Sequence, residues 1–264
     1  MSQTPSSDDE LAGTEQPFVQ HLMELRDRLV KAIVAVGLVA AVLFFFPGPG
    51  ALYDLLAAPL VAHLPKGATL IATSVISPFM VPLKILLMSA FMIALPVVLW
   101  QVWGFIAPGL YIHEKKLVLP LVVSSTLLFL VGVAFCYFFV FGKVFAFIQG
   151  FAPKSITAAP DIEAYLSFVI TMFISFGLAF EVPIVVVVLA RLGMVSVAQL
   201  KSFRGYFIVL AFVIAAIVTP PDVVSQLALA IPMVMLYELG IWAAQLFIRH
   251  TKAPEDDEEA ASGP

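Results

Sequence analysis

The least expected ionisable residue of this sequence is Glu181, which lies in a long apolar stretch just before Pro183. A carboxyl group inside hydrocarbon is costly, so it indicates either a function or a structural need. The functional interpretation is a hydrogen-bonding group that faces a substrate or a partner. The structural interpretation is a glutamate that compensates for the backbone hydrogen bond lost at Pro183. Glu238 lies in another apolar stretch, and contact between helices explains it equally well.

Two further carboxylates lie at the ends of apolar stretches. Glu24 and Arg28 are four residues apart, which is the spacing of an ordinary ion pair within one helix. Glu114 precedes Lys115 and Lys116, as a solvated loop charge would. Judged by residue type alone, both carboxylates are surface charges rather than binding groups.

No residue pattern typical of an enzyme is present in the sequence. The single cysteine, Cys136, lies in an apolar stretch, which favours a packing role. His21 and His113 have no metal-ligand residues at a useful spacing, and a zinc-protease motif is absent. No glycine-rich phosphate loop and no nucleophile elbow occurs. We therefore expect no catalytic activity, no metal, no cofactor and no nucleic acid partner.

The composition places these residues in a membrane protein. Hydrophobic residues make up 61% of the 264 residues and charged residues 12%, against roughly 45–50% and about 25% in soluble domains. A helix needs roughly 20 apolar residues to cross about 30 Å of hydrocarbon. The sequence predicts an all-α protein with six transmembrane helices within residues 18–250. The expected spans are 29–46, 82–104, 117–140, 164–190, 206–218 and 226–247.

The segments between the spans have recognisable breaks. An amphipathic lead-in to the first span places His21, Glu24 and Arg28 on one face, and a Pro-Gly-Pro-Gly sequence at 47–50 ends that span. We expect long loops at 51–77, with short helical pieces, and at 142–163.

The fifth and sixth spans are expected to be short, and the two ends of the chain are expected to be disordered. The fifth span has only about 13 apolar residues and so falls short of the hydrocarbon thickness. The sixth, which contains Pro232 and Glu238, is also expected to be short. The acidic ends, residues 1–17 and 251–264, are predicted to be disordered tails.

Basic residues predict the orientation of the spans, because lysine and arginine concentrate on the cytoplasmic side. With six spans, both termini share one side, which holds ten basic residues near the spans against four on the other. The ten are Arg26, Arg28, Lys31, Lys115, Lys116, Arg191, Lys201, Arg204, Arg249 and Lys252. We therefore expect both termini in the cytoplasm.

Six short stretches of the sequence form, when they are taken together, a pattern that is specific enough to compare with a known family. They are 21–29 (HLMELRDRL), 57–60 (AAPL), 77–79 (SPF), 103–116 (WGFIAPGLYIHEKK), 176–183 (FGLAFEVP) and 219–226 (TPPDVVSQ). In this order, over roughly residues 17–250, they resemble the TatC family of the twin-arginine protein translocase.

The resemblance implies a concave, glove-like bundle of six helices in the bacterial inner membrane. Members of this family bind the twin-arginine signal peptides of folded precursor proteins. They assemble with the single-span subunits TatA and TatB and with further copies of themselves. Export by the family is driven by the proton-motive force without nucleotide hydrolysis.

The resemblance also suggests roles for individual residues. The signal-peptide patch of the family corresponds here to Glu24, Arg26, Phe105 and Glu114. We expect Arg26 to orient Glu24 or to pair with an acidic residue of a partner. The intramembrane polar site corresponds to Glu181, and the outer turn that contacts partners corresponds to Pro220, Pro221, Asp222 and Gln226.

The main alternative is a small secondary transporter in which Glu181 is a proton or ion site, since carboxylates near the midplane serve this purpose in transporters. That interpretation predicts a repeat between the two halves of the chain, and none is evident in the sequence. It also gives no role to Glu24 and Glu114. An intramembrane protease is disfavoured because the sequence lacks a nucleophile motif and a metal motif.

Overall fold

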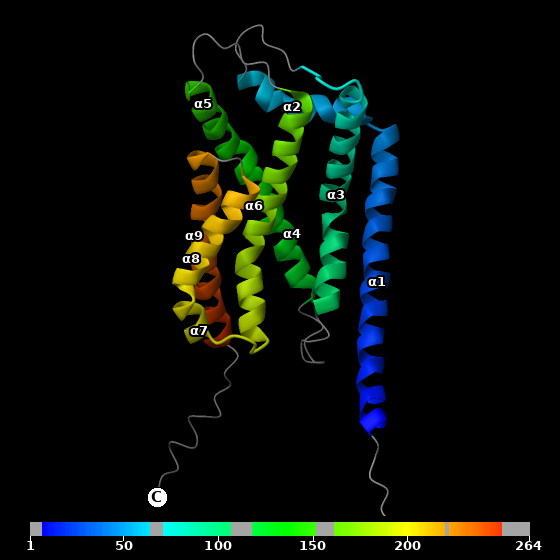
Figure 1. Cartoon of the computed structure of the whole chain (residues 1–264), viewed down its shortest axis with the longest axis vertical. Helices are drawn as coiled ribbons and strands as arrows, with labels where there is room; N and C mark the ends of the chain where they lie inside the picture. The colour runs from blue at the N-terminus through cyan, green and yellow to red at the C-terminus, as the bar shows by residue number, and fades with distance from the viewer. Residues whose placement is uncertain (1–6, 64–70, 107–117, 152–160, 220–221, 250–264) are drawn as a thin grey trace, which may run out of the picture. The chain divides into compact units, whose positions relative to one another are not determined.

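The structure is a computed structural model that describes residues 7–63, 71–106, 118–151, 161–219 and 222–249. Within these residues it is all-helical, apart from an isolated β-bridge (Figure 1). The elements are α1 Ser7–Phe45, α2 Pro49–His63, α3 Ser77–Ile106, α4 Val118–Phe135, the π-helical turn η3 Cys136–Val140, α5 Phe141–Phe151, α6 Ile162–Arg191, α7 Val197–Ser202, α8 Arg204–Val218 and α9 Val223–Arg249. Among the described residues, five helical segments are long and apolar enough to cross a membrane, and α8 is a shorter apolar helix. The prediction of an all-α protein with a short fifth span is therefore confirmed.

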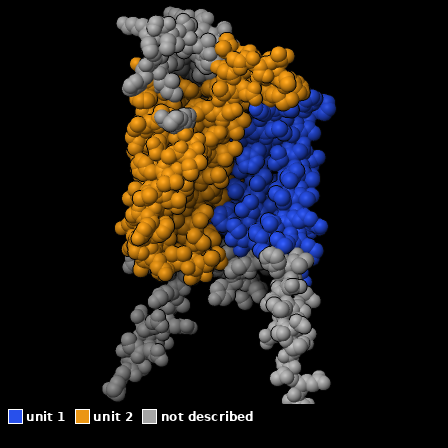
Figure 2. Space-filling model, in the orientation of Figure 1, with its two compact units in different colours: residues 1–54, 82–123 blue, residues 55–81, 124–264 orange. Residues whose placement is uncertain are grey.

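The chain divides into two compact units, each built from two separate segments (Figure 2). Unit 1 comprises Met1–Asp54 and Pro82–Val123, and unit 2 comprises Leu55–Val81 and Ser124–Pro264. Each unit has its own apolar cluster. The predicted concave bundle concerns the arrangement of the units and stays a prediction.

Unit 1 pairs α1 with α3. Leu43 of α1 packs with Leu86 and Ala90 of α3, and all three are buried. Helix α1 has 39 residues, so it is roughly 58 Å long and extends well beyond the hydrocarbon. Its apolar part, 20–45, carries the span, while the polar face of the lead-in lies toward its N-terminal side.

The predicted end of the first span is confirmed. Gly48 has a φ of +90°, a conformation that favours glycine, and its N–H donates to the carbonyl of Leu43 over 3.0 Å. Pro49 then begins α2, a position where the missing N–H of proline leaves no helical hydrogen bond unmade. The helical pieces expected in 51–77 are represented by α2.

Unit 2 is held together by glycines at helix crossings and by aromatic packing. A Cβ at Gly177 of α6 would lie 2.3 Å from the ring of Phe129 of α4, and one at Gly240 of α9 would lie 2.9 Å from the Cα of Pro183. Only glycine therefore lets these helices approach so closely. Helix α6 packs along α9, which also packs against α8.

The loop predicted at 142–163 begins later than expected. After the π-helical turn the chain continues as α5 as far as Phe151. Phe141 is buried and stacks on Phe173 of α6, with 5.3 Å between the ring centroids, and Val144 is fully buried. This packing prolongs the helix through the first part of the predicted loop, as far as Phe151.

The prediction that span 6 is short is wrong. Helix α9 has 27 residues and contains Pro232. Because the lost backbone bond at a proline can be tolerated where neighbouring helices pack closely, Pro232 does not end the helix. At the chain ends, α1 already begins at Ser7, within the tail predicted for 1–17, and 251–264 lie outside the described residues.

Asp161 joins the segments before α3 and α6 within unit 2. Its Oδ1 accepts hydrogen bonds from the N–H groups of Glu163 and Ala164, so it caps α6. Its Oδ2 accepts from the N–H of Thr73 over 3.1 Å and also from the Thr73 hydroxyl. Nearby, the N–H of Ile162 donates to the carbonyl of Ile71 over 2.9 Å. These bonds, the Thr73 hydroxyl first, lower the pKa of Asp161 from its ordinary value to about 2.

We expect Asp161→Asn to lower the melting temperature at pH 6 and to do so less at pH 3. A depressed folded-state pKa stabilises the fold above the unfolded pKa of about 3.9, and this contribution is lost as the pH falls toward about 2. Thermal unfolding of both proteins in detergent measures the difference. An equal difference at the two pH values would show that the charge of Asp161 does not stabilise the fold.

Candidate functional site

The polar face of α1 is ordered by one ion pair. Arg28 donates to Oε1 of Glu24 from Nε over 2.9 Å and from Nη2 over 2.7 Å. The side chains are partly buried, with 25% of Arg28 and 36% of Glu24 exposed. The ion pair expected from the spacing is confirmed. Both bonds end on Oε1, and within the described residues Oε2 of Glu24 accepts none.

This face of α1 lies against the C-terminal end of α3 (Figure 1). One turn before Glu24, the ring of His21 stacks on Phe105 with 4.3 Å between centroids. One turn after Glu24, Arg28 lies over Gly104, where a Cβ would be 2.4 Å from Nη1. The structure thus brings Glu24 and Phe105, two of the predicted patch residues, to the same end of unit 1.

Arg26 does not orient Glu24, which is one of the two roles expected for it; the other, pairing with an acidic residue of a partner, stays a prediction. Its Nε and Nη2 both donate to Oδ1 of Asp27, over 3.0 and 2.7 Å. This pair is open to solvent, with 70% of Arg26 and 56% of Asp27 exposed. Arg28 orients Glu24 instead, because residues four apart share a helix face whereas residues two apart do not. The fourth patch residue, Glu114, lies outside the described residues.

Glu181 is buried in unit 2 with only 8% of its surface exposed. Neither of its oxygens has a hydrogen-bond partner among the described residues. The fully buried side chain of Ser125 on α4 interacts with this carboxyl, but the two groups do not form a hydrogen bond of standard geometry. The glutamate therefore does not fill the backbone gap at Pro183, as the structural interpretation required.

Glu238 behaves as an ordinary contact between helices. Its Oε2 accepts from Nη2 of Arg204 over 2.7 Å, which joins α9 to the start of α8. The interpretation of Glu238 as a structural residue is confirmed.

The segment before and at the start of α9, predicted to be an outer turn, combines helix capping with polar atoms that have no partner among the described residues. Oδ1 of Asp222 accepts from the N–H of Ser225 over 2.7 Å, which caps α9. Nε2 of Gln226 donates to the carbonyl of Phe212 over 3.4 Å and so links α9 to α8. Oδ2 of Asp222 and Oγ of Ser225 are buried without partners among the described residues. Pro220 and Pro221 lie outside those residues.

Sequence reasoning missed the role of three residues at the α1–α3 face. The sequence excludes His21 as a metal ligand and predicts an ion pair for Arg28, but neither of these assignments predicts a contact with α3, and Gly104 has no local signal. The helical spacing of His21, Glu24 and Arg28 was a usable signal. Nothing local indicated Gly104, because the close approach of Arg28 depends on how α1 packs on α3.

Comparison with known proteins identifies the family. Residues 20–232 match the family described as "Sec-independent protein translocase protein (TatC)". The chain belongs to the TatC family. It is 48% identical to "Sec-independent protein translocase protein TatC" of Azotobacter chroococcum mcd 1, over 100% of this chain and 99% of that one. The protein of the same name from Halothiobacillus neapolitanus is 49% identical over 92% of this chain, which spans 66% of that protein's length.

A solved structure agrees with this assignment. It is described as "Crystal Structure of Twin Arginine Translocase Receptor- TatC", and it superposes with a TM-score of 0.74 at 42% identity, covering 86% of this chain and 98% of that chain. A TatC-family chain is a multi-pass membrane component of a protein translocase, not an enzyme. Membership therefore decides against the secondary transporter and the intramembrane protease.

Proposed function

We propose that this TatC-family chain is the receptor subunit that binds twin-arginine signal peptides, with Glu24, Arg26, Phe105 and Glu114 at the binding patch. The observation that carries this proposal is the position of Glu24 on the α1 face that contacts Phe105 through His21, with Oε1 held by Arg28 and Oε2 accepting no bond from a described residue. The solved relative described as a twin-arginine translocase receptor supports it.

The geometry at Glu24 suits arginine better than lysine. Guanidinium presents parallel N–H donors to a carboxylate, which the ammonium of lysine does not reproduce. An incoming arginine can take Oε2 while Arg28 keeps Oε1 in place. A solvent-exposed ion pair contributes only about 0–1 kcal/mol, so the partial burial of Glu24 favours selectivity. Glu114 would supply the acceptor for the second arginine.

The apolar part of the signal peptide would lie along the same end of unit 1. Phe105 is partly buried, and its neighbours Val102 and Ile106 are exposed hydrophobic residues. Leu22 and Leu25 of α1 are also exposed. Burying such side chains against a peptide contributes a favourable free energy of roughly 25 cal/mol per Å² of apolar surface. This contribution increases the affinity but does not distinguish arginine from lysine.

The receptor would work with partner subunits. We infer that TatA and TatB, each with a single span, pack near the outer turn of 220–226, where Asp222 and Ser225 have buried polar atoms without partners in the described chain. Further copies of this chain would join the same complex. The proton-motive force would drive export.

Glu181 is the proposed intramembrane polar site, offering hydrogen bonds to the signal peptide or to a partner's span. We expect Glu181→Gln, which keeps shape and hydrogen bonding, to reduce export less than Glu181→Ala. Protein abundance should stay the same in both variants, because the carboxyl makes no hydrogen bond of standard geometry with a described residue. Export of a twin-arginine precursor measures the effect. Equal loss in both variants would mean that ionisation matters, and wild-type export in both would remove Glu181 from the site.

The proposed location is the bacterial inner membrane with both termini in the cytoplasm, supported by the ten-to-four distribution of basic residues. In a chain whose Cys136 is replaced by alanine, a membrane-impermeant thiol reagent added from outside should label Lys154→Cys and spare Lys201→Cys. Equal labelling at both positions would contradict this orientation.

Photo-crosslinking tests the receptor proposal directly. A photoreactive amino acid at position 114 should crosslink an Arg-Arg signal peptide much more strongly than the same peptide with Lys-Lys. The matched control places the probe at Asp54 of α2, away from the patch. Equal crosslinking of both peptides at position 114, or equal yields at positions 114 and 54, would contradict the proposed binding site.

A further inference from the structure

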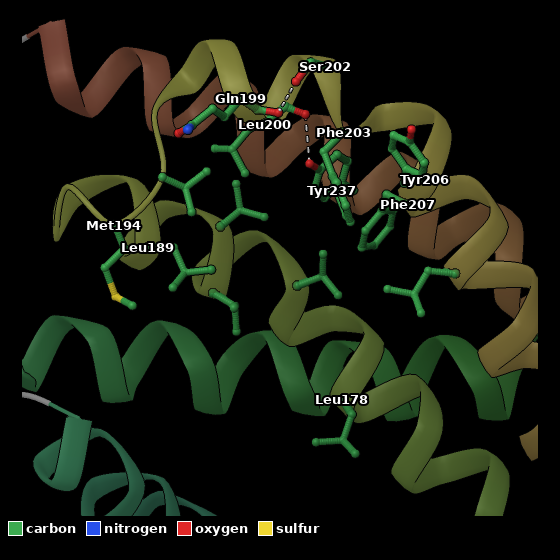
Figure 3. A pocket seen from close by; sticks show the side chains of 15 residues that line it. Leu178, Leu189, Met194, Gln199, Leu200, Ser202, Phe203, Tyr206, Phe207 and Tyr237 are labelled. Carbon is green, nitrogen blue, oxygen red and sulfur yellow. Dashed lines mark hydrogen bonds between the residues drawn. The ribbon is translucent and has the colours of Figure 1, made fainter.

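Two of the ring stacks that join neighbouring helices differ in their exposure. In unit 2, Phe207 of α8 stacks on Tyr237 of α9 with 3.9 Å between centroids (Figure 3). Tyr237 is only 4% exposed, and its hydroxyl donates to the carbonyl of Leu200 over 2.9 Å. In unit 1, His21 stacks on Phe105 with 4.3 Å between centroids and 21° between the ring planes, yet His21 is exposed. The first stack is a buried contact of the fold, whereas the second leaves a polar ring accessible.

The His21 ring is held in place by the packing of α1 on α3. Phe105 covers one face of the imidazole and is the only ring of the described residues that stacks on it. One residue earlier on α3, Gly104 lies beneath Arg28, and a Cβ there would be 2.4 Å from Nη1. These two contacts lie on either side of Glu24 along α1. His21, Glu24 and Arg28 are therefore held as one row against α3.

This row determines the side from which a second cation can approach Glu24. Residues three or four apart on a helix have about 5–6 Å between their Cβ atoms, so His21 lies one turn before Glu24 and Arg28 one turn after it. Both hydrogen bonds from Arg28 end on Oε1. A cation on the Arg28 side would be repelled, whereas the His21 side is seven residues, or about 10 Å, from Arg28 along the axis. The incoming charge is therefore favoured beside the ring of His21.

An aromatic ring beside a carboxylate suits arginine better than lysine. The guanidinium is planar and weakly hydrated, so it can stack on a ring while the N–H groups at its edge donate to a carboxylate. A cation within about 6 Å of a ring centroid is attracted to the ring face. The ammonium of lysine is compact and strongly hydrated, and it has no plane to stack. The imidazole of His21 and the carboxylate of Glu24 thus match two features that only arginine combines.

We propose that His21 is a specificity-determining residue, whose ring stacks on the guanidinium of the signal-peptide arginine that binds Glu24. This inference rests on the proposed receptor function and identifies the group that distinguishes the plane of a guanidinium from an ammonium. Phe105 supports the other face of the imidazole, so it also acts as a positioning residue for His21.

Binding of labelled Arg-Arg and Lys-Lys signal peptides to the protein in nanodiscs tests the proposal. His21→Leu removes the ring but keeps an apolar contact with Phe105. We expect it to weaken Arg-Arg binding roughly two- to five-fold, the effect of an exposed cation–π contact, and to change Lys-Lys binding little. His21→Phe keeps a ring face and should bind the Arg-Arg peptide like wild type. Phe45→Leu is the matched control, since it removes an exposed ring at the other end of α1.

The proposal is overturned if His21→Leu binds both peptides like wild type. It is also overturned if His21→Leu weakens both peptides equally, which is a structural effect, or if His21→Phe loses as much Arg-Arg binding as His21→Leu, which assigns the role to the ring nitrogens. Because His21 is exposed and His21→Phe preserves the stack, at least one variant retains the fold.

A double variant separates this inference from the receptor proposal. In a chain that carries Glu24→Ala, His21→Leu should cause no further loss of Arg-Arg binding, because the guanidinium is no longer held beside the ring. A further loss of the same size would overturn the inference. If Glu24→Ala alone binds the Arg-Arg peptide like wild type, Glu24 has no place in the receptor patch. If Glu24→Ala weakens Arg-Arg binding and His21→Leu does not, only the role of His21 is wrong.

Discussion

Replacing Glu24 with alanine is expected to weaken binding of an Arg-Arg signal peptide roughly five- to 30-fold and to change binding of its Lys-Lys version little. Hydrogen bonds to charged groups contribute about 1–3 kcal/mol. Since 36% of Glu24 is exposed, solvent screens the contact, and about 1–2 kcal/mol is the appropriate part of that range. The loss should be specific to arginine because Oε2, which accepts no bond from the described residues, suits a guanidinium fork.

Binding of labelled signal peptides to the protein in nanodiscs measures this effect. Asp54→Ala is the matched control, since it removes an exposed carboxylate of the same unit outside the patch. Glu114→Ala should have the same arginine-specific effect, and Glu114→Lys a larger one because it repels the ligand. If both alanine variants bind the Arg-Arg peptide like wild type, Glu24 and Glu114 are surface charges, and recognition lies elsewhere.

A methyl group at Gly132 is expected to destabilise unit 2 by about 1–3 kcal/mol, the usual cost of overpacking. The new Cβ of Gly132→Ala would lie 2.5 Å from the carbonyl oxygen of Phe176 and 2.9 Å from the ring of Phe180. The ring could rotate away, but the carbonyl belongs to the backbone of α6 and moves only if the helices separate. We therefore expect the upper part of the range.

Thermal unfolding in detergent provides the measurement for Gly132→Ala. Gly37→Ala is the matched control, because a Cβ at Gly37 of α1 meets nothing within 4 Å. Its melting temperature should equal or slightly exceed that of wild type, since alanine favours a helix more than glycine does. Equal melting temperatures for the two variants would show that α4 and α6 do not need this close contact.

Local features of the chain were predictable because they depend on neighbouring residues. The length of each apolar run determined which segments can span a bilayer, and the Pro-Gly-Pro-Gly sequence at 47–50 determined where the first span ends. Helical periodicity placed His21, Glu24 and Arg28 on one face. The family resemblance, rather than composition, distinguished Glu24 and Phe105 from ordinary surface residues, and the structure brings these two side chains to one end of unit 1.

Contacts between distant segments were decided only by the tertiary structure. Phe105 lies against His21 across α1 and α3, Asp161 binds Thr73 at a separation of 88 residues, and α5 continues past Gly142 because Phe141 packs on Phe173. Hydrophobic runs show that a helix has an apolar surface, but many partners can bury such a surface equally well. The partner is chosen by close fit at a few positions, such as Gly177 against Phe129, and that fit exists only once the helices have packed.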